Sequence, residues 1–250
     1  MAWRSSGHSN EGLIDNLFKH GLIKSPKVKE AMMKVDRANF CPDATSAYED
    51  SPQPIGHSAT ISAPHMHANA VESLLPYLHE RARILDIGSG SGYLTAVFAE
   101  LACPETGKPE VQAGEKARVV GLENIPALRD LGEMNMAKTP RGRKLLDSSQ
   151  VQFVVGDGRK GWGDEKGWDA IHVGAAASEL HQKLIDQLRS PGRLFIPVED
   201  PTSRWGDQHI WVVDKDENGN VKKKQMYGVR YVPLTDAPPG TAKAEDAGIP

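Results

Sequence analysis

Three glycines at alternate positions, Gly88, Gly90 and Gly92, form the stretch of this sequence with the clearest chemical capacity. They follow a short apolar run at 84–87 and precede apolar residues that recur at helical spacing. This order predicts a strand, a tight turn and a helix. Glycine lets the backbone adopt positive φ and lets a ligand approach closely, while free N–H groups at a helix start attract polar or anionic groups. We therefore expect a small polar ligand to dock on this turn.

The spacing of the glycines separates two classes of nucleotide-binding enzyme. The dinucleotide fingerprint is G-x-G-x-x-G, whereas residues 88–93 read Gly-Ser-Gly-Ser-Gly-Tyr, so the third glycine comes one residue early. This spacing disfavours a nicotinamide-dependent oxidoreductase. Asp86 lies just before the turn, as an acidic residue does in methyltransferases that bind S-adenosylmethionine, where it holds the ammonium group of the cofactor.

A serine and two histidines lie just ahead of a predicted helix. The hydroxyl of Ser62 could orient a carboxylate by donating to one of its oxygens, or it could cap the helix that Pro64 opens. The residues themselves leave both interpretations open. His65 and His67 could suggest a metal site, but no neighbouring Cys, Asp or Glu completes a ligand set, so we expect no metal.

Two acidic residues stand at the ends of predicted strands. Glu123 ends the strand at 117–123, where a carboxylate can accept hydrogen bonds from both hydroxyls of an adenosine ribose. Asp157 follows the strand at 151–155, where it can accept from an adenine amino group or form an ordinary Asp-Gly turn. Both residues could also be plain strand-end acids.

Composition limits the class of protein. The 250 residues suffice for one α/β domain, and the net charge of −3, with both signs interspersed, gives no basic field of the kind that binds nucleic acid. Cys41 and Cys103 are too few for a disulfide framework or a zinc cluster. Without a secretory signal or a bilayer-length apolar span, we expect a cytoplasmic protein with no membrane partner. The lack of coiled-coil or repeat patterns favours a monomer.

The chain before the glycine turn must position the serine and the histidines. Periodicity predicts two helices ahead of the sheet. The first is capped by Ser9 or Asn10 and carries Leu13, Ile14, Leu17 and Phe18 on one face, and Pro26 opens the second. Residues 43–63 are rich in Pro, Ser and Gly with little periodicity, so we predict a long loop there. Loops of this length in a compact domain are usually functional or disordered.

Strands and helices alternate through the middle of the chain. Strands are predicted at 84–87, 117–123, 151–155, 168–173 and 193–198. A helix is predicted at 178–188, residues 103–116 are predicted as a surface insertion, and the basic residues Arg141, Arg143 and Lys144 as part of a solvated loop. This alternation predicts an α/β fold of the doubly wound, Rossmann-like type with a mostly parallel sheet.

The last third of the chain changes character. The Asn-Gly pair at 218–219 stands between alternating runs at 209–213 and 226–234, which predicts an antiparallel C-terminal hairpin at the edge of the sheet. The tail at 237–250, rich in Ala, Gly and Pro, is predicted to be disordered.

The chain closely resembles the protein-L-isoaspartate (D-aspartate) O-methyltransferase family, whose members have the class I methyltransferase fold. The matching segments lie at 1–3, 50–53, 59–67, 85–92, 154–159, 169–177, 184–188 and 231–236. The glycine turn is common to most methyltransferases, whereas Ala-Thr-Ile-Ser-Ala-Pro-His-Met-His at 59–67 is specific to this family. The insertion at 103–116, Ser-Pro-Gly-Arg at 190–193 and the tail depart from the family pattern.

The resemblance implies a reaction. A methyl group passes from S-adenosylmethionine to the α-carboxylate of L-isoaspartyl or D-aspartyl residues in damaged proteins and peptides, leaving S-adenosylhomocysteine and a methyl ester that returns toward aspartate through a succinimide. A carboxylate with a reference pKa of about 3.3 to 3.7 is already ionised at pH 7, so the reaction needs no general base. A methyltransferase with another acceptor, and a non-catalytic binding module, are the alternatives.

The resemblance also implies roles for particular residues. Ser62 matches the residue usually named as the active site. Cofactor contacts are implied for Ala59, Thr60, Ile61, Ser62, His67, Asp86, Gly88, Ser89, Gly90, Glu123, Asn124, Asp157, Gly158 and Thr235. Substrate contacts are implied for Ser62, His65 and Val232. The expected organisation is one domain at 1–236, with N-terminal helices and substrate loop at 1–80, a cofactor-binding core at 81–200 and the hairpin at 201–236.

Overall fold

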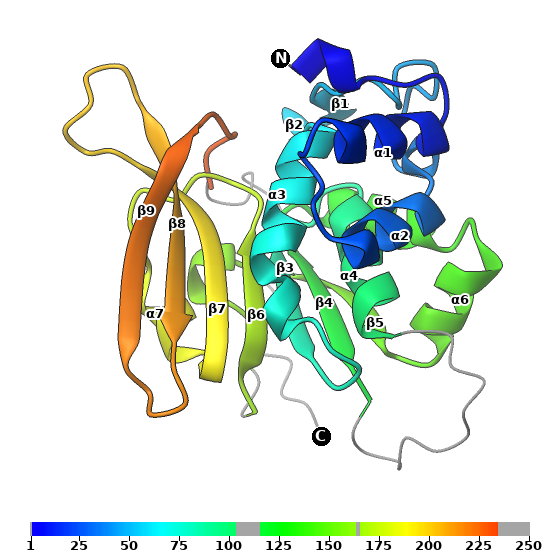
Figure 1. The fold of residues 1–250 in the computed structure, drawn as a ribbon. Helices are drawn as coiled ribbons and strands as arrows, with labels where there is room; N and C mark the ends of the chain where they lie inside the picture. The colour runs from blue at the N-terminus through cyan, green and yellow to red at the C-terminus, as the bar shows by residue number, and fades with distance from the viewer. Residues whose placement is uncertain (1, 104–115, 164–165, 235–250) are drawn as a thin grey trace.

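A seven-stranded sheet in the order β5-β4-β3-β6-β7-β8-β9 forms the centre of the computed structural model, which describes residues 2–103, 116–163 and 166–234 (Figure 1). Its strands are β3 (Arg83–Ile87), β4 (Arg118–Glu123), β5 (Val151–Val155), β6 (Trp168–Val173), β7 (Leu188–Glu199), β8 (Gln208–Lys215) and β9 (Val221–Val229). The first five strands in this order, β5, β4, β3, β6 and β7, pair in parallel, whereas β8 pairs antiparallel with both β7 and β9. The predicted mostly parallel sheet with an antiparallel C-terminal hairpin is confirmed.

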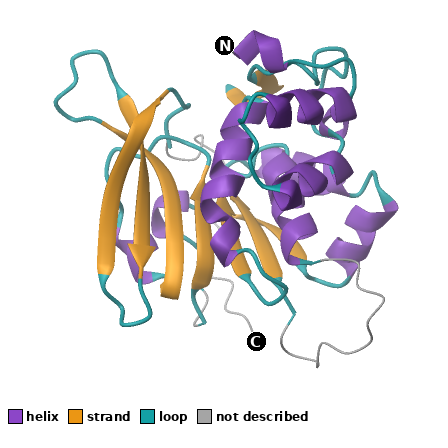
Figure 2. Ribbon diagram, in the orientation of Figure 1, coloured by secondary structure: helices purple, strands orange, loops and turns teal. Residues whose placement is uncertain are grey.

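Side chains of the sheet alternate between two apolar layers, because successive residues of a strand point to opposite faces. Along β3, Ile84 packs into one layer, and Leu85 and Ile87 pack into the other. The first layer is covered by α1 (Asn10–Lys19), α2 (Pro26–Lys34), α3 (Pro64–Leu74), α4 (Tyr93–Ala102), α5 (Pro126–Met136) and α6 (Pro140–Asp147). The short helix α7 (Gln182–Asp186) packs into the second layer (Figure 2).

The two N-terminal helices form where the sequence predicts them. Ser9 caps α1, since its side chain accepts a hydrogen bond from the backbone N–H of Gly12, and Pro26 opens α2. Of the four apolar residues predicted on one face of α1, Leu13, Ile14 and Leu17 are buried, whereas Phe18 is 37% exposed and lies under the Lys29 ammonium, 4.8 Å from the ring centroid. A cation over the ring offsets the cost of leaving part of an aromatic side chain in water.

Residues 43–63 are not one long loop. They include several turns followed by a two-stranded antiparallel ribbon, β1 (Gln53–Gly56) and β2 (Ala59–Ile61). The ribbon turns at His57 and Ser58, whose φ angles are +51° and +57°. The usual hairpin signals place Asn or Gly at such positions. Because His and Ser stand there instead, the local sequence does not predict this turn.

Three other boundaries differ from the prediction. The basic residues around Arg141 belong to α6, where Thr139 caps the helix and Arg141 pairs with Glu100 at 3.1 Å, so the predicted loop is wrong. Helix α7 is shorter than the predicted 178–188, because β7 begins at Leu188. Strand β9 begins at Val221, five residues before the predicted run and one residue after the Asn-Gly pair. For α6, Thr139-Pro140 is a signal for a helix start, which the prediction from basic composition overlooked.

Some predictions fall outside the described residues. These are Thr235, the tail at 237–250 and nearly all of the insertion at 103–116. Within the described ranges, no helix combines the length and the apolar character needed to cross a bilayer.

Candidate functional site

The turn between β3 and α4 requires glycine at three positions. Gly88, Gly90 and Gly92 have φ angles of +73°, +52° and +88°, a region that side chains disfavour. A Cβ on Gly92 would lie 3.0 Å from the backbone of Gly132, and a Cβ on Gly90 would lie 3.1 Å from Cδ1 of Ile55. The turn is packed closely against its neighbours, and the predicted strand, turn and helix are confirmed.

A cleft lies over this turn, where the carboxyl ends of β3 and β6 meet. It is lined by Thr60, Ile61, Ser62, His67, Asp86, Gly88, Ser89, Gly90, Ser91, Tyr93, Leu94, His172, Gly174 and Tyr231. The first eight of these are predicted cofactor residues, so the fold brings together segments on either side of β3. The other predicted cofactor residues within the described ranges, Ala59, Glu123, Asn124, Asp157 and Gly158, do not line the cleft.

Asp86 is held at the base of the cleft by two buried donors. Its Oδ1 lies 2.7 Å from Nδ1 of His172 on β6, and its Oδ2 accepts from the Thr95 hydroxyl at 2.5 Å. Because a carboxylate only accepts, His172 carries a proton on Nδ1. The His172 ring stacks on Phe195, with centroids 6.0 Å apart, and meets the edge of Phe98 at 5.9 Å. These contacts leave Asp86 little freedom to move.

Glu123 ties the end of β4 to the glycine turn. Its Oε2 accepts from the backbone N–H of Gly90 at 3.0 Å, and its Oε1 accepts from those of Asn124 and Ile125 at 2.9 and 3.2 Å. Burial raises the pKa of Glu123, and these three N–H groups oppose the rise. The carboxylate therefore lies directly beside the cleft-lining turn, although it does not line the cleft itself.

Asp157 forms a local turn with Arg159. Its Oδ1 accepts from the backbone N–H and Nε of Arg159 at 3.0 and 2.9 Å, and its Oδ2 accepts from Nη2 at 3.0 Å. The hydrogen bonds from the Arg159 side chain hold the pKa of Asp157 below its usual value. This geometry is that of the ordinary Asp-Gly turn. Gly158 is packed so tightly that a Cβ would lie 2.3 Å from Cγ2 of Ile87.

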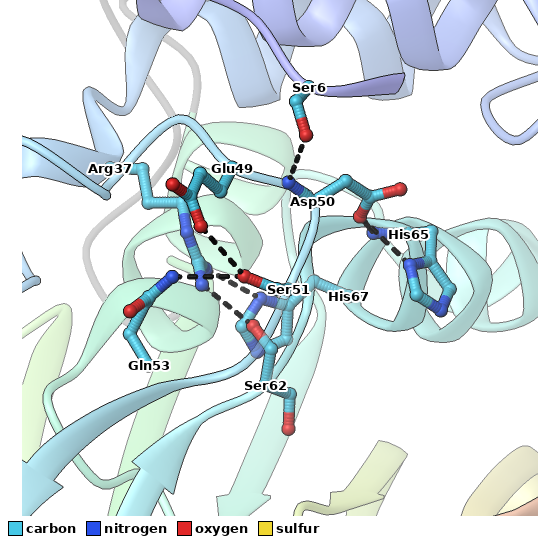
Figure 3. A network of polar contacts seen from close by, with 9 residues as sticks. All are labelled: Ser6, Arg37, Glu49, Asp50, Ser51, Gln53, Ser62, His65 and His67. Atoms are coloured by element: carbon cyan, nitrogen blue, oxygen red, sulfur yellow. Dashed lines mark hydrogen bonds and ion pairs between the residues drawn. The ribbon is translucent and has the colours of Figure 1, made fainter. Parts of the chain in front are cut away.

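Ser62 does not cap the helix that follows it. The N-cap of α3 is Ala63, which has no side-chain hydrogen bond, so the capping interpretation of Ser62 is wrong. The backbone carbonyl of Ser62 accepts from Nη2 of Arg37 at 2.9 Å, and its side chain points to the opposite side (Figure 3). The hydroxyl is thereby left at the wall of the cleft.

His65 lies on the first turn of α3, beside a second hollow. Its Nδ1 and its backbone N lie 2.8 and 3.0 Å from Oδ1 of the buried Asp50 (Figure 3). The second hollow is lined by His65, Met66, Asn69, Tyr227, Gly228, Val229, Arg230 and Tyr231. Tyr231 borders both hollows, and the next residue, Val232, is fixed through its carbonyl, which accepts from the N–H of Ala176 at 2.8 Å.

Sequence reasoning assigned no site role to six residues that line the cleft, nor to Arg37 directly behind it; the six are Ser91, Tyr93, Leu94, His172, Gly174 and Tyr231. His172 is a polar residue inside an otherwise apolar buried strand, a signal that could have marked it. Tyr93 follows the last glycine of the turn and had no assigned role. Arg37 had no signal at all, because its contacts with Ser62 and His67 join segments far apart in the sequence.

The cleft suits a polar ligand. Within the described part of the chain, the hydroxyls of Ser89, Ser91 and Tyr93 are buried without a hydrogen-bond partner, and all three residues line the cleft. A buried polar group without a partner costs about 1–3 kcal/mol, so a ligand that bonds to these hydroxyls would be stabilised. The described residues contain no cluster of three His, Cys, Asp or Glu side chains suited to a metal ion. These features fit the amino-acid end of S-adenosylmethionine.

Comparisons with known proteins show the family that this chain is similar to. The family model described as protein-L-isoaspartate(D-aspartate) O-methyltransferase matches residues 8–238. Protein-L-isoaspartate O-methyltransferase 1 of Arabidopsis thaliana is 44% identical over 231 residues, which cover 92% of this chain and 93% of that one. The Caenorhabditis elegans protein-L-isoaspartate O-methyltransferase is 43% identical over 235 residues, with 94% and 96% covered.

A solved structure extends the likeness to the fold. A protein-L-isoaspartate O-methyltransferase from Plasmodium falciparum, solved in complex with S-adenosyl-L-homocysteine, superposes with a TM-score of 0.79 at 32% identity. The superposition covers 92% of this chain and 99% of that one.

Proposed function

The chain belongs to the protein-L-isoaspartate(D-aspartate) O-methyltransferase family, and we propose that the cleft over its glycine turn is where it acts. The protein is a repair methyltransferase that transfers the methyl group of S-adenosylmethionine to the α-carboxylate of L-isoaspartyl and D-aspartyl residues in damaged proteins and peptides. S-adenosylhomocysteine is the other product. When bound, S-adenosylmethionine supplies a methyl group on a positively charged sulfur.

The observation that carries the proposed site is the position of the Ser62 hydroxyl. Ser62 lines the cleft together with Asp86 and the glycine turn, and its hydroxyl does not cap α3. Because the substrate carboxylate is already ionised, the chain must place it and need not remove a proton. Ser62 can donate to one carboxylate oxygen and leave the other free to attack.

We assign the remaining residues by their place around the turn. Cofactor contacts are proposed for Ala59, Thr60, Ile61, Ser62, His67, Asp86, Gly88, Ser89, Gly90, Glu123, Asn124, Asp157, Gly158 and Thr235. The ends of β3, β4 and β5 are neighbours along one edge of the sheet, which supports a single ligand reaching from Asp86 past Glu123 to Asp157. Substrate contacts are proposed for Ser62, His65 and Val232, beside the two hollows that share Tyr231.

The organisation of the whole chain is also a proposal. We propose one domain at 1–236, in which residues 1–80 and 201–236 flank a cofactor-binding core at 81–200. We further propose a cytoplasmic monomer that acts on proteins and not on nucleic acids or at a membrane. The net charge of −3 and the two free buried cysteines, Cys41 and Cys103, support a protein of a reducing compartment without a nucleic-acid partner.

One labelling experiment tests the function. The protein is incubated with radiolabelled S-adenosylmethionine and two peptides that differ only in an isoaspartyl or a normal aspartyl linkage. We expect a base-labile methyl ester on the isoaspartyl peptide alone. Equal labelling of both peptides, or labelling of neither while S-adenosylhomocysteine still binds, would assign the chain to another acceptor.

A further inference from the structure

Arg37 is a buried arginine without a carboxylate within ion-pair distance among the described residues. Its side chain is fully buried, and its guanidinium lies over the ring of Tyr93, 5.4 Å from the centroid. Burial lowers the pKa of Arg37, but an arginine stays protonated in proteins. The charge of Asp50 favours the protonated Arg37 from beyond ion-pair distance, but burying a charge without a direct ion pair is costly, so a role in stability alone explains this residue poorly.

The backbone of Arg37 is fixed by the N-terminal helices. Its N–H donates to Oδ1 of Asn10 at 3.3 Å, and the amide of Asn10 donates in turn to the carbonyls of Met32 and Met33 at 3.1 and 3.2 Å. Asn10 is the first residue of α1, and Met32 and Met33 lie near the end of α2. The guanidinium therefore projects from a rigid base.

The guanidinium reaches two residues that line the cleft. Its Nη2 donates to the carbonyl of Ser62 at 2.9 Å, and its Nη1 lies 3.4 Å from Nδ1 of His67 (Figure 3). Because an arginine can only donate, Nδ1 of His67 must accept and the ring proton must be on Nε2. Burial first, and then the Arg37 charge, hold the pKa of His67 well below its usual value, so the ring is neutral.

We propose that Arg37 is a positioning residue of the methyltransferase cleft: it holds the Ser62 backbone and fixes His67 as an Nε2–H donor. This inference rests on the proposed function, because it assigns Ser62 and His67 their partners in the same site. One side chain thereby sets the orientation of two cleft walls, the segment directly after β2 and the helix α3. The α1 and α2 helices thereby help to position the cleft residues, because they hold the backbone of Arg37.

The first test removes the guanidinium and measures activity. Arg37→Met keeps the apolar stem, and we expect kcat/KM for an isoaspartyl peptide to fall by about 100-fold, the loss expected when reacting groups are displaced by about 1 Å. Arg37→Lys keeps the charge but cannot reach both acceptors from one fork, so its loss should be intermediate. Unchanged kcat/KM in both variants would overturn the proposal.

Arg193→Met is the matched control. Arg193 also donates to a backbone carbonyl, that of Ser73, and also lies over a tyrosine, with its guanidinium 5.3 Å from the Tyr77 ring centroid. It differs from Arg37 in pairing with a carboxylate, since its Nε and Nη2 donate to Asp214 at 2.5 and 3.0 Å. It does not line the cleft. We expect this variant to lose stability and to keep the kcat/KM of the unchanged chain. A loss of activity equal to that of Arg37→Met would show a general effect of removing a packed arginine.

The second test reads the histidine directly and needs no turnover. Ring ¹⁵N spectra, with His67 assigned from a His67→Gln variant, should show a single Nε2–H tautomer in the unchanged chain. In Arg37→Met the tautomers should mix and the titration midpoint of His67 should rise, because the Arg37 charge that lowers its pKa is gone, although burial and the neighbouring His172 and His65 still lower it. If Arg37→Met does not fold, the same spectra of Arg37→Lys serve as the test, and mixed tautomers of His67 in that variant would support the role of Arg37.

The two tests separate this proposal from the proposed function. An unchanged His67 spectrum in the variants would overturn the role of Arg37, whatever the activity. If the unchanged chain fails to methylate isoaspartyl peptides while the His67 spectrum responds to Arg37, the proposed substrate fails and the positioning role stands.

Discussion

Nδ1 of His172 lies 2.7 Å from Oδ1 of Asp86, and the two residues are direct partners across the parallel strands β3 and β6. Both side chains are buried beneath the cleft. The contact therefore does two things at once: it satisfies a buried carboxylate, and it joins the central pair of strands at the point where the ligand is proposed to lie.

Replacing His172 by phenylalanine should weaken both stability and ligand binding. The new ring fits an aromatic slot between Phe98 and Phe195, but Asp86 loses a donor while it stays buried. Hydrogen bonds to charged groups contribute about 1.5–3 kcal/mol, so we expect a loss of about that size in the free energy of unfolding, measured with urea. Calorimetric titration should show weaker binding of S-adenosylhomocysteine.

Tyr77→Phe provides the control for that variant. It removes a hydroxyl that donates to another aspartate, Asp214, at 3.4 Å and away from the cleft. Binding of S-adenosylhomocysteine should be unchanged in it. Unweakened binding in His172→Phe would mean that the His172 contact does not position Asp86 for the ligand.

Ser62→Ala separates catalysis from capping. Because Ala63 is the N-cap of α3, the substitution should change the free energy of unfolding by no more than about 0.5 kcal/mol. We expect kcat/KM for the isoaspartyl peptide to fall clearly. Ser9→Ala is the opposite case, since Ser9 does cap α1, and it should cost about 1 kcal/mol of stability with activity kept. A destabilised but fully active Ser62→Ala would contradict the proposed role.

The parts of the fold that the sequence predicts are those with local signals. The apolar strands and the positive φ of Gly88, Gly90 and Gly92 follow from short stretches, and both are confirmed. The contacts between site residues do not follow from short stretches. The Asp86–His172 contact joins positions 86 residues apart, and only the sheet register brings them together.

The two wrong loop predictions have a different cause. Both loops were predicted from composition. In residues 43–63, however, the pairing of β1 with β2 forms an ordered ribbon. Near Arg141, the cap at Thr139 starts a helix. Polar composition is compatible with an ordered element whenever one side chain caps it or a neighbour covers it.

His67 should make the protein less stable in acid. Its pKa is well below 6.5 in the folded chain, mainly through burial, so below pH 6.5 the unfolded chain binds a proton that the folded chain does not. The free energy of unfolding should therefore fall as the pH drops below 6.5, by up to about 1.4 kcal/mol per pH unit from this group.

Urea titrations at several pH values test this, with His67→Gln removing the titrating ring. The pH slope of the free energy of unfolding should be smaller in that variant. The exposed His20→Gln should keep the slope of the unchanged chain. Equal slopes in all three proteins would show that His67 ionises alike in the folded and unfolded states.

Gly92→Ala should lower the free energy of unfolding more than Gly206→Ala, a change at another glycine with positive φ. Positive φ costs a side chain about 1–2 kcal/mol, and the new Cβ would also meet the Gly132 backbone and the Phe153 ring at 3.0 Å. Overpacking adds about 1–3 kcal/mol. Gly206 also has positive φ, +68°, but open space around it, so Gly206→Ala should show the strain alone. Equal losses in urea unfolding would mean that the turn relaxes around the methyl group.

The protein should become its own substrate on ageing, at Asn218-Gly219 in the exposed turn between β8 and β9. An isoaspartyl linkage forms when the N–H of the following residue attacks the asparagine side chain, and glycine leaves that nitrogen unshielded. In the folded turn this N–H donates to the carbonyl of Asp216 at 3.0 Å, which should slow the attack without preventing it. After long warm storage, labelled S-adenosylmethionine should place methyl groups in the hairpin peptide, and Asn218→Ser should abolish them. A hairpin peptide that stays unlabelled in the stored, unchanged chain would contradict this prediction.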